Sequence, residues 1–503
     1  MGRAGFIAPD RVEAPLVLAI DIGTSLVRMM LFDRLGRALE NACWRHSSTV
    51  RTSRDGASEV DADALLQIVW DGIDAVLGGA GPLAEKIAGV AACTFVGNVM
   101  GIDHKARPLT PVFTYADTRA EKQARRLRLE FEEHAVHART GCRFHSSYLP
   151  ARLRWLMETR PGLTRKVARW ASLGEYMALK LFGETGVSYS AASWTGLLDR
   201  NRLVWDAQLL AALPVDVNQL SPLTDISAPQ RGLRKEFATR WPRLRDLPWI
   251  PAVGDGAAAN IGSGCISSSR VALTMGSTTA LRTVTQEPVD NLPEGLWCYR
   301  VDGVRSLPGG ALSEGGNVFA WMKQALRLGN QASLEQRVSE LEPDGHGLTL
   351  LPFLSGERAP GWQGMARAVI HGICLATTPV EILRAGMEAV ACRIALVLDR
   401  LGTILPPDFQ IVAGGGALRK SPVWLQIITD VLGREIEVSS IQEPSARGAA
   451  LLALEALGFV GNPEDIPGEI VRTCHPDSGR HEIYRRALKR QVKLYEKLIK
   501  EPE

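Results

Sequence analysis

The chain has 503 residues, enough for two or three domains with sizeable cores. It is 46% apolar and 22% charged, and a net charge of +3 gives no reason to expect a nucleic-acid partner. The eight cysteines form no C-x-x-C pair, which indicates reduced thiols and not a disulfide or metal framework. We expect a cytoplasmic protein without a membrane partner, since no apolar run reaches spanning length and residues 1–15 lack an apolar signal core.

An apolar strand over residues 16–22 carries a carboxylate, Asp21, near its end. A Gly-Thr-Ser turn at 23–25 follows, and a second apolar strand runs to Asp33, so the pattern predicts an antiparallel hairpin. A charge at the end of a buried strand is costly unless a metal ion or hydrogen-bond donors meet it. The turn therefore suits a phosphate group and its magnesium ion, although an ordinary hairpin explains this stretch alone equally well.

The segment after this hairpin alternates helices and strands. Apolar periodicity predicts a helix over 60–78 and strands over 87–95 and 99–103. The next strand leads to Asp117, two residues before Arg119. An acid–guanidinium pair at a strand end can bind a polyol, but its spacing alone favours a structural ion pair.

A mainly helical segment comes next, with polar loops at 140–145 and 188–196 that we expect to border a cleft. A polar, proline-bearing stretch at 231–251 then marks a change in composition. We place the domain boundary directly after it, which predicts domains 1–252 and 253–503.

Asp255 lies between two glycines, Gly254 and Gly256, directly before a helix of small residues. The start of a helix offers N–H groups and a positive dipole, and the glycines let a substrate approach closely. A carboxylate in this place could take the proton from a hydroxyl nucleophile. A simple N-cap also explains Asp255, although capping needs no glycine on each side.

Residues 267–284 repeat the plan of the first hairpin: an apolar strand, a turn with hydroxyls after Gly276, and a second strand. Two copies of one unit, one in each half, predict two similar domains that face each other across a cleft. We expect Asp21 and Asp255 to come from opposite halves and to meet there, one serving a metal ion and the other an incoming alcohol. Two unrelated hairpins are the weaker interpretation, because both turns share the same composition.

A strand at 410–413 leads through three glycines, Gly414, Gly415 and Gly416, toward a helix that begins at Pro422. Strand, bare glycines and helix suit a phosphorylated ligand held against the backbone, with a nucleotide as the first choice. The signal is weak by itself, because a triple glycine is often only a flexible turn.

The order of these stretches resembles the FGGY family of carbohydrate kinases, and within it the gluconate kinases. The likeness runs along residues 16–457. It is carried by seven motifs in family order: Tyr115-Ala-Asp117-Thr-Arg119, Thr140-Gly141 with His145, Tyr189-Ser190-Ala-Ala-Ser193 with Thr195-Gly196, Gly254-Asp255-Gly256-Ala-Ala-Ala-Asn260, Gly315-Gly316-Asn317, Gly356-Glu357-Arg358-Ala-Pro360 with Trp362, and Ser445-Ala-Arg447-Gly448-Ala. The resemblance implies a two-domain α/β fold of the actin/hexokinase-like (ribonuclease H-like) type, with duplicated mixed-sheet domains around a central cleft.

Carried over position by position, the resemblance implies that Asp255 is the catalytic base and that Asp21 and Asp255 serve a bound Mg²⁺ ion. It implies contacts with ATP at Gly23, Thr24, Ser25, Arg28, Gly276, Ser277, Thr278, Gly414, Gly415 and Gly416. It implies contacts with the substrate at Asn98, Tyr115, Asp117, Arg119, His145 and Gly256.

The likeness is weaker on the acceptor side. Val96 and Gly97 stand where gluconate kinases usually carry an aromatic residue and a histidine, Tyr115 replaces the usual Trp, and Ser188 the usual Asp. The stretch at 313–314 also departs from the common pattern. A gluconate carboxylate needs a cation, and three residues are candidates: Arg119, Arg143 and His145.

We therefore expect an ATP-dependent kinase for a terminal hydroxyl of a small sugar or sugar acid, with D-gluconate giving 6-phospho-D-gluconate as the first choice. One alternative is the same chemistry on a pentulose or another ketose, and a second is a non-catalytic nucleotide-binding relative. The presence of both Asp21 and Asp255 argues against the second, because a protein that only binds needs no base. The oligomeric state stays open, with a homodimer as one option.

Overall fold

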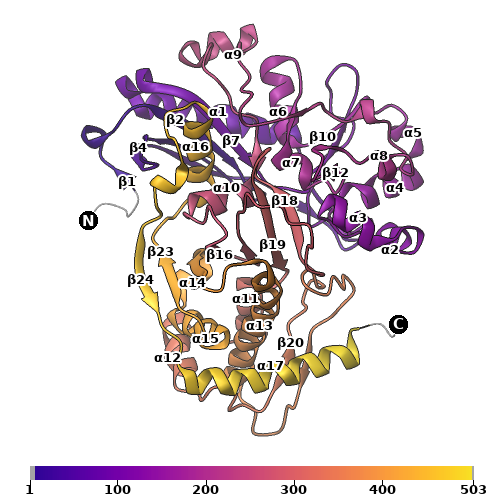
Figure 1. The fold of residues 1–503 in the computed structure, drawn as a ribbon, viewed down its shortest axis with the longest axis vertical. Helices are drawn as coiled ribbons and strands as arrows, with labels where there is room; N and C mark the ends of the chain where they lie inside the picture. The colour runs from indigo at the N-terminus through magenta and orange to yellow at the C-terminus, as the bar shows by residue number, and fades with distance from the viewer. Residues whose placement is uncertain (1–5, 501–503) are drawn as a thin grey trace.

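The computed structural model describes residues 6–500, and its two main β-sheets divide between the two halves of the chain (Figure 1). Within the described residues the first sheet has six strands, in the order β1 (Phe6–Ile7), β4 (Ala38–Ser47), β3 (Leu26–Phe32), β2 (Leu16–Ile22), β7 (Ile87–Thr94) and β15 (Val253–Gly254). The second has seven, in the order β18 (Trp297–Arg300), β19 (Ser306–Leu312), β17 (Thr279–Arg282), β16 (Arg270–Met275), β22 (Gln410–Gly414), β23 (Ile436–Ser439) and β24 (Ile470–Cys474).

The two sheets share one pattern of neighbours. In the first, β4, β3 and β2 are antiparallel, and β7 and β15 continue in parallel with β2. In the second, β19, β17 and β16 are antiparallel, and β22 and β23 continue in parallel with β16. The predicted α/β fold with two domains built on duplicated mixed sheets is thus confirmed, together with both predicted hairpins.

The central strand β2 is apolar apart from Asp21, and all of its residues are buried, as a strand covered on both faces requires. Helix α1 (Ala62–Ala80) covers β3 and β4 with the apolar stripe that the sequence predicts, and the side chain of Asp61 caps it by accepting from the backbone N–H of Ala64 at 2.9 Å. The long helix α13 (Pro379–Leu401) packs in the same way against β17 and β19 of the second sheet.

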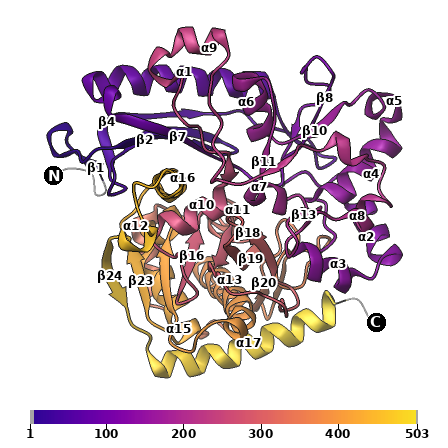
Figure 2. The same ribbon diagram turned by 45° about the horizontal axis from the view of Figure 1, so that its top comes forward.

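Two helices cross between the sheets, α10 (Asp255–Gly262) and α16 (Pro444–Ala456), as Figures 1 and 2 show. Their backbones touch at two glycines. A Cβ on Gly262 would lie 1.8 Å from the carbonyl oxygen of Pro444, and one on Gly448 would lie 1.8 Å from that of Ala258. The helices can approach this closely only without side chains at these points, so this crossing sets how near the two domains come.

Strand β15 belongs to the first sheet, where Gly254 pairs with Thr94 of β7. The predicted boundary at 252/253 therefore falls directly before the last strand of that sheet. Asp255 begins α10 immediately after β15, and Asp21 lies near the end of β2, so both residues belong to the edge of one sheet. The expectation that they come from opposite halves is wrong, because two residues of pairing with β7 carry the chain back into the first domain.

Between β7 and β15 the chain inserts a helical segment, which lies on the right in both views (Figures 1 and 2). Its helices include α2 (Glu121–Glu130), α3 (Glu133–Thr140), α4 (Leu149–Thr159), α6 (Leu173–Phe182), α7 (Tyr189–Ser193) and α8 (Ala207–Leu210). The last helix, α17 (Ser478–Leu498), crosses the far end of the second domain. Among residues 6–500, no disulfide joins the cysteines, and no helix has both the length and the apolar character of a membrane span.

Candidate active site

Asp21 and Asp255 lie at the same edge of the first sheet. Asp21 of β2 is paired in register with Cys93 of β7, and Val253 of β15 is paired with the same cysteine. Neighbouring strands are about 4.8 Å apart, so β2 and β15 are separated by about 10 Å. Both carboxylates therefore stand over the carboxyl ends of parallel strands, the edge at which α/β sheets bind ligands.

The environment of Asp255 suits a proton acceptor. Burial, together with the negative charge of Asp21, raises the pKa of Asp255 to about 7, against the opposing charge of Arg282. The backbone N–H of Gly256 donates to Oδ1 of Asp255 at 2.7 Å and holds the carboxylate in place. A carboxylate with a pKa near neutral is basic enough to accept a proton, and a large fraction of it is ionised at neutral pH. A general base needs both properties.

Asp21 is buried, and burial raises its pKa, whereas Arg28 opposes this rise. Nη1 of Arg28 lies 3.0 Å from Oδ2 of Asp21, and Nε of Arg28 lies 2.9 Å from Oε2 of Glu443. Arg45 forms a second ion pair with Glu443, at 2.8 Å. Because Glu443 precedes α16, this row of charges joins the two domains beside Asp21. The sequence indicated Arg28, but not Glu443, whose place before the small-residue helix was its only signal.

Two tight turns connect the hairpin strands of the two domains. In the first, the N–H of Gly23 donates to the carbonyl of Leu26 at 3.0 Å, and in the second, the N–H of Gly276 donates to that of Thr278 at 2.9 Å. Helix α11 (Gly316–Ala325) supports the second turn, because the N–H of Gly316 donates to the carbonyl of Gly276 at 2.9 Å. The glycines and hydroxyl residues of the two turns are at least partly exposed: Gly23, Thr24 and Ser25 in the first, and Gly276 and Ser277 in the second.

The triple glycine lies beside the second turn. Strands β16 and β22 are parallel neighbours that pair Thr274 with Gly414, so their ends meet. Gly415 has a φ of +100°, and a Cβ on it would lie 2.2 Å from the carbonyl oxygen of Met275. A Cβ on Gly276, Gly414 or Gly416 would instead meet no atom within 4 Å. These three glycines form an open cradle of bare backbone, which fits a phosphorylated nucleotide.

A cavity of about 150 Å³ lies next to Asp255 and Gly256, between the first sheet and the second domain. Thr278, Ala280 and Arg282 of the second hairpin line it, together with Arg358 from the loop at 352–368. Six aromatic side chains complete its wall: Tyr115, Tyr148, Trp194, Trp297, Tyr299 and Trp362. A lining of aromatic rings together with charged groups is suited to a small polar molecule with carbon–hydrogen faces.

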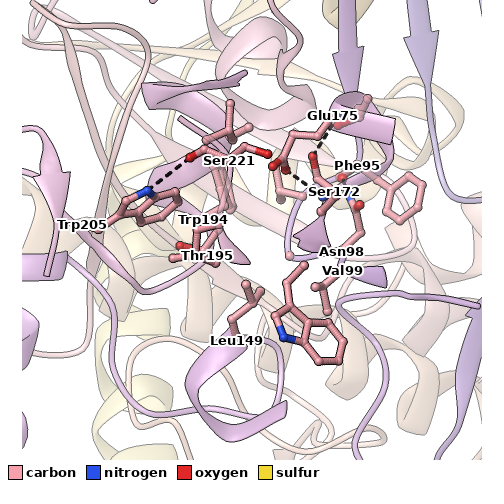
Figure 3. Close-up of a pocket in the computed structure, with 18 residues that line it drawn as sticks. Phe95, Asn98, Val99, Leu149, Ser172, Glu175, Trp194, Thr195, Trp205 and Ser221 are labelled. Atoms are coloured by element: carbon pink, nitrogen blue, oxygen red, sulfur yellow. Dashed lines mark hydrogen bonds between the residues drawn. The ribbon is translucent and has the colours of Figure 1, made fainter. Parts of the chain in front are cut away.

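Of the predicted substrate residues, Tyr115 and Gly256 line this cavity, whereas Asn98 lies in a separate hollow of about 20 Å³ (Figure 3). The amide of Asn98 is used within the fold. Its Nδ2 donates to the carbonyl of Phe95, and its Oδ1 accepts from the N–H of Leu173 at 2.7 Å. Asn98 therefore holds two segments of the inserted region together and does not face Asp255.

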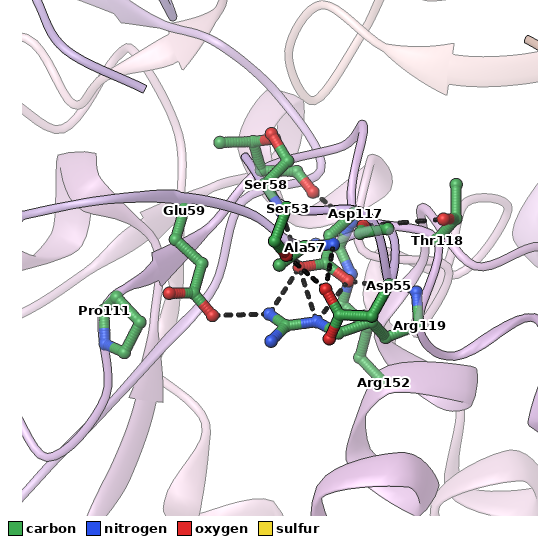
Figure 4. Close-up of polar contacts among 12 residues, drawn as sticks. Ser53, Asp55, Ala57, Ser58, Glu59, Pro111, Asp117, Thr118, Arg119 and Arg152 are labelled. Atoms are coloured by element: carbon green, nitrogen blue, oxygen red, sulfur yellow. Dashed lines mark hydrogen bonds and ion pairs between the residues drawn. The ribbon is translucent and has the colours of Figure 1, made fainter. Parts of the chain in front are cut away.

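Asp117 and Arg119 do not line the cavity either. Nη2 of Arg119 lies 2.6 Å from Oδ2 of Asp117 and 2.5 Å from Oε1 of Glu59 (Figure 4). The guanidinium also stacks on Trp155, 4.6 Å from the ring centroid. The pair is the structural ion pair that its spacing favoured, and its charges are satisfied within the fold.

The other two cations proposed for a carboxylate are also unsuited to it. His145 packs behind the cavity wall, 5.4 Å from the ring of Trp362, and burial with the charges of Arg128 and Arg358 lowers its pKa to about 3, so its imidazole is neutral at pH 7. Arg143 pairs with Glu133 and has a longer contact of 3.4 Å with Glu294.

Arg282 and the aromatic wall were not expected from the sequence. Trp194 stacks on Tyr299 with ring centroids 3.7 Å apart, and Trp297 also stacks on Tyr299, at 4.3 Å. Arg282 could have been found, because Thr278, Ala280 and Arg282 alternate and therefore point to one face of β17. Alternation also places Trp297 and Tyr299 on one face of β18, but the other aromatic residues of the wall come from distant parts of the chain, and nothing in the sequence places them together with these two.

Comparisons with known proteins identify the family of the chain. The N-terminal domain model of the FGGY family of carbohydrate kinases matches residues 16–262, and the C-terminal domain model matches residues 271–457. The gluconokinase of Bacillus subtilis is 26% identical over 455 residues, with 88% of each chain covered. The apulose kinase of Pectobacterium atrosepticum is 28% identical over 488 residues, covering 93% of this chain and 95% of its own.

Solved structures share the fold along almost the whole chain. A gluconate kinase and a xylulose kinase, both from Lactobacillus acidophilus, superpose with TM-scores of 0.87 at 23% identity. Each comparison covers 96% of this chain and 98% of the other. The two family models together span most of the sequence, and the chain is a member of the FGGY family of carbohydrate kinases.

Proposed function

We propose that this sugar kinase transfers the terminal phosphoryl group of ATP to a terminal hydroxyl of D-gluconate, giving 6-phospho-D-gluconate. The observation that carries the proposal is Asp255, a carboxylate with a pKa of about 7 that lines a cavity of small-molecule size and lies at the same sheet edge as Asp21. The likeness to gluconokinases supports the choice of acceptor.

In this reaction, Asp255 accepts the proton of the acceptor hydroxyl while the hydroxyl oxygen forms its bond to phosphorus and the bond to ADP breaks. The N–H bond from Gly256 keeps the carboxylate oriented toward the cavity. The cavity wall holds the acceptor close to the phosphoryl donor, which turns an encounter of two molecules into a reaction within one complex.

The residues present fit a divalent cation and a nucleotide. Asp21 offers a buried carboxylate oxygen, the ligand type that Mg²⁺ prefers, and Asp255 offers a second at the same sheet edge. A bound Mg²⁺ ion supplies neutralisation of the phosphate charges. The two turns, Gly23 to Ser25 and Gly276 to Thr278, would contact the phosphates with Arg28, and the open cradle of Gly276, Gly414 and Gly416 would leave room for the nucleotide.

A second candidate is the same transfer to a pentulose such as xylulose. The observation in its favour is that a xylulose kinase matches the fold as well as a gluconate kinase does, both with a TM-score of 0.87. Both candidates use the same base and the same ATP side, and they differ only in what the cavity accepts.

Coupled assays of ADP release over a panel of sugar acids, ketoses and polyols test the proposal, with Asp255→Asn as the control for contaminating kinases. We expect turnover on D-gluconate that depends on both ATP and Mg²⁺ and is lost in the control. Turnover on xylulose but not on gluconate would support the second candidate. Absence of turnover on every acceptor would overturn the kinase assignment itself.

A further inference from the structure

Two guanidinium groups line the cavity that contains Asp255, and they reach it from different elements of the second domain. Arg282 ends strand β17, and Arg358 comes from the loop at 352–368 between β20 (Thr349–Leu351) and β21 (Val369–His371). Neither has a carboxylate within ion-pair distance among the described residues. Other arginines of the fold have such a partner, as Arg119 has in Asp117 and Arg143 in Glu133, or donate to backbone carbonyls, as Arg447 does.

The side chain of Arg282 has donors without acceptors. Its Nε and Nη1 atoms are buried, and no group among residues 6–500 accepts a hydrogen bond from either of them. It lies close to the base, since a Cβ on Gly256 would be 3.3 Å from Nε of Arg282. Burying a guanidinium with unsatisfied N–H groups costs free energy. A bound ligand that brings acceptor oxygens would remove this cost.

Arg358 is held in place by its surroundings. Its Nη2 donates to the carbonyl oxygen of Leu312 at 2.6 Å, which fixes one edge of the guanidinium and leaves the other edge for the cavity. The preceding residue, Glu357, is buried and accepts hydrogen bonds from the N–H groups of Gly361 and Gln363 at 3.3 and 3.4 Å. Hydrogen bonds within the loop therefore hold the segment that carries Arg358 in one conformation, and the guanidinium is preorganised.

The charges around the cavity do not balance. Two guanidinium groups line the cavity together with one carboxylate, that of Asp255. A second carboxylate near Arg358, that of Glu314, has its pKa raised to about 8 by burial, which outweighs the charges of Arg393 and Arg358, so it is mainly protonated at pH 7. The cavity therefore has an excess of positive charge, which favours an acceptor that carries a negative charge of its own.

We infer that Arg282 and Arg358 together bind the carboxylate of the acceptor, so that the kinase is specific for an aldonic acid over a neutral sugar or polyol. The inference rests on the proposed function, since it concerns the same cavity. Guanidinium groups match carboxylates with paired N–H donors. Two small residues, Ala280 and Ala311, also line the cavity and leave room in it; they are cross-strand neighbours on β17 and β19.

The decisive comparison uses two acceptors that differ only in charge: D-gluconate and its neutral alditol, D-glucitol. Arg282→Met and Arg358→Met should each lower kcat/KM for gluconate by about 100-fold, mainly through KM, and leave the KM for ATP unchanged. The small activity on glucitol should change by less than about threefold, because no charge is lost from that complex. Arg367→Met is the matched control, since Arg367 lies exposed in the same loop and hydrogen-bonds the carbonyl of Ala366.

Binding measured without ATP separates this inference from the proposed function. Calorimetric titration of gluconate into the full chain and into Asp255→Asn should show binding in both, and Arg282→Met or Arg358→Met should abolish it, with Arg282→Lys restoring part. If no acceptor is phosphorylated but gluconate binding depends on both arginines, the inference stands and the proposed function fails. If xylulose is phosphorylated, and Arg282→Met and Arg358→Met phosphorylate it with the same kinetics as the unsubstituted chain, the kinase assignment stands and the inference fails. A rise in the KM for ATP in place of that for gluconate would also overturn it, because the arginines would then bind phosphate.

Discussion

The carboxylate of Asp21 acts on that of Asp255 along one edge of a single sheet, and its charge adds to burial in raising the pKa of Asp255 to about 7. Asp21 is paired with Cys93 of β7, and Asp255 follows strand β15, whose Val253 is paired with the same cysteine. The distance across two strands is short enough for one charge to perturb the other and long enough to leave room between them for reactants.

The rate of phosphorylation should follow the ionisation of Asp255. A general base works only when deprotonated, so kcat/KM for the acceptor should rise with pH, reach half its plateau near pH 7, and fall about tenfold for each pH unit below that. Steady-state kinetics from about pH 5.5 to about pH 8.5 measure the profile. A profile that is flat across this range would show that the ionisation of Asp255 does not limit the reaction.

Replacing Asp255 with Asn should lower turnover by about 10²–10⁴-fold and, at alkaline pH, stabilise the fold. The pKa of Asp255 is raised from 3.8 in the unfolded chain to about 7, so its protonated form stabilises the fold below pH 3.8, and this contribution is lost as the pH rises through 7. Asn cannot ionise. Urea denaturation at pH 8 should therefore show a gain of roughly 1–3 kcal/mol, which shrinks at pH 5. Asp103→Asn should show no gain, because hydrogen bonds from Arg107 lower the pKa of Asp103 to about 2.

Two neighbouring glycines should respond differently to alanine. Gly415 has a φ of +100°, and its Cβ would lie 2.2 Å from the carbonyl oxygen of Met275, so Gly415→Ala should cost more than about 2 kcal/mol of unfolding free energy. Gly416→Ala meets no atom within 4 Å and should leave stability unchanged within about 0.5 kcal/mol. It should still raise the KM for ATP, by about tenfold, because the methyl group enters the cradle. An unchanged KM for ATP in Gly416→Ala would place the nucleotide elsewhere.

The C-terminal helix should affect acceptor binding through one hydroxyl. Tyr495 of α17 donates to Oε2 of Glu357 at 2.6 Å, and Glu357 organises the loop that carries Arg358. Tyr495→Phe should cost about 1 kcal/mol of stability and raise the KM for gluconate a few-fold, with the KM for ATP unchanged. Tyr484→Phe is the matched control, because Tyr484 lies on the same helix and donates at 3.0 Å to Glu388. It should lose similar stability without a change in either KM. Equal effects of both variants on the acceptor would contradict this role for Tyr495.

Arg447 should be essential to the joint between the domains. Its buried guanidinium donates to the carbonyl oxygens of Gly36 and Gly262 at 3.1 and 2.7 Å and to those of Ile466 and Pro467 at 3.1 and 3.2 Å. Arg447→Met leaves these acceptors unsatisfied and should reduce the free energy of unfolding by roughly 3–5 kcal/mol. Lysine should not restore it, because one ammonium group cannot reach all four carbonyls.

Chemical denaturation followed by tryptophan fluorescence measures this loss. Arg485→Met on the exposed side of α17 serves as the control and should change stability by less than about 0.5 kcal/mol. A loss at Arg447 no larger than at Arg485 would mean that water replaces the guanidinium at the joint.

The sequence by itself determined the hairpins, the helices that cover them and the duplication. These depend on local patterns: the period of apolar residues, the glycine-hydroxyl turns after buried strands, and the capping residue Asp61. It also indicated Asp21, Asp255 and the triple glycine as candidate site residues, because a buried charge and bare backbone have few structural uses.

Only the tertiary structure decided which side chains share the cavity. Strand β15 joins the first sheet through two residues, too few for periodicity to assign, and that pairing places Asp255 next to Asp21. Asp117 with Arg119 showed the same kind of pattern as a binding pair, yet Glu59 satisfies the arginine from a distant strand. Arg282 and Arg358 line one cavity although they are 76 positions apart in the chain, since long-range packing and not local sequence brings two elements to one surface. Specificity for the acceptor is a property of that packing.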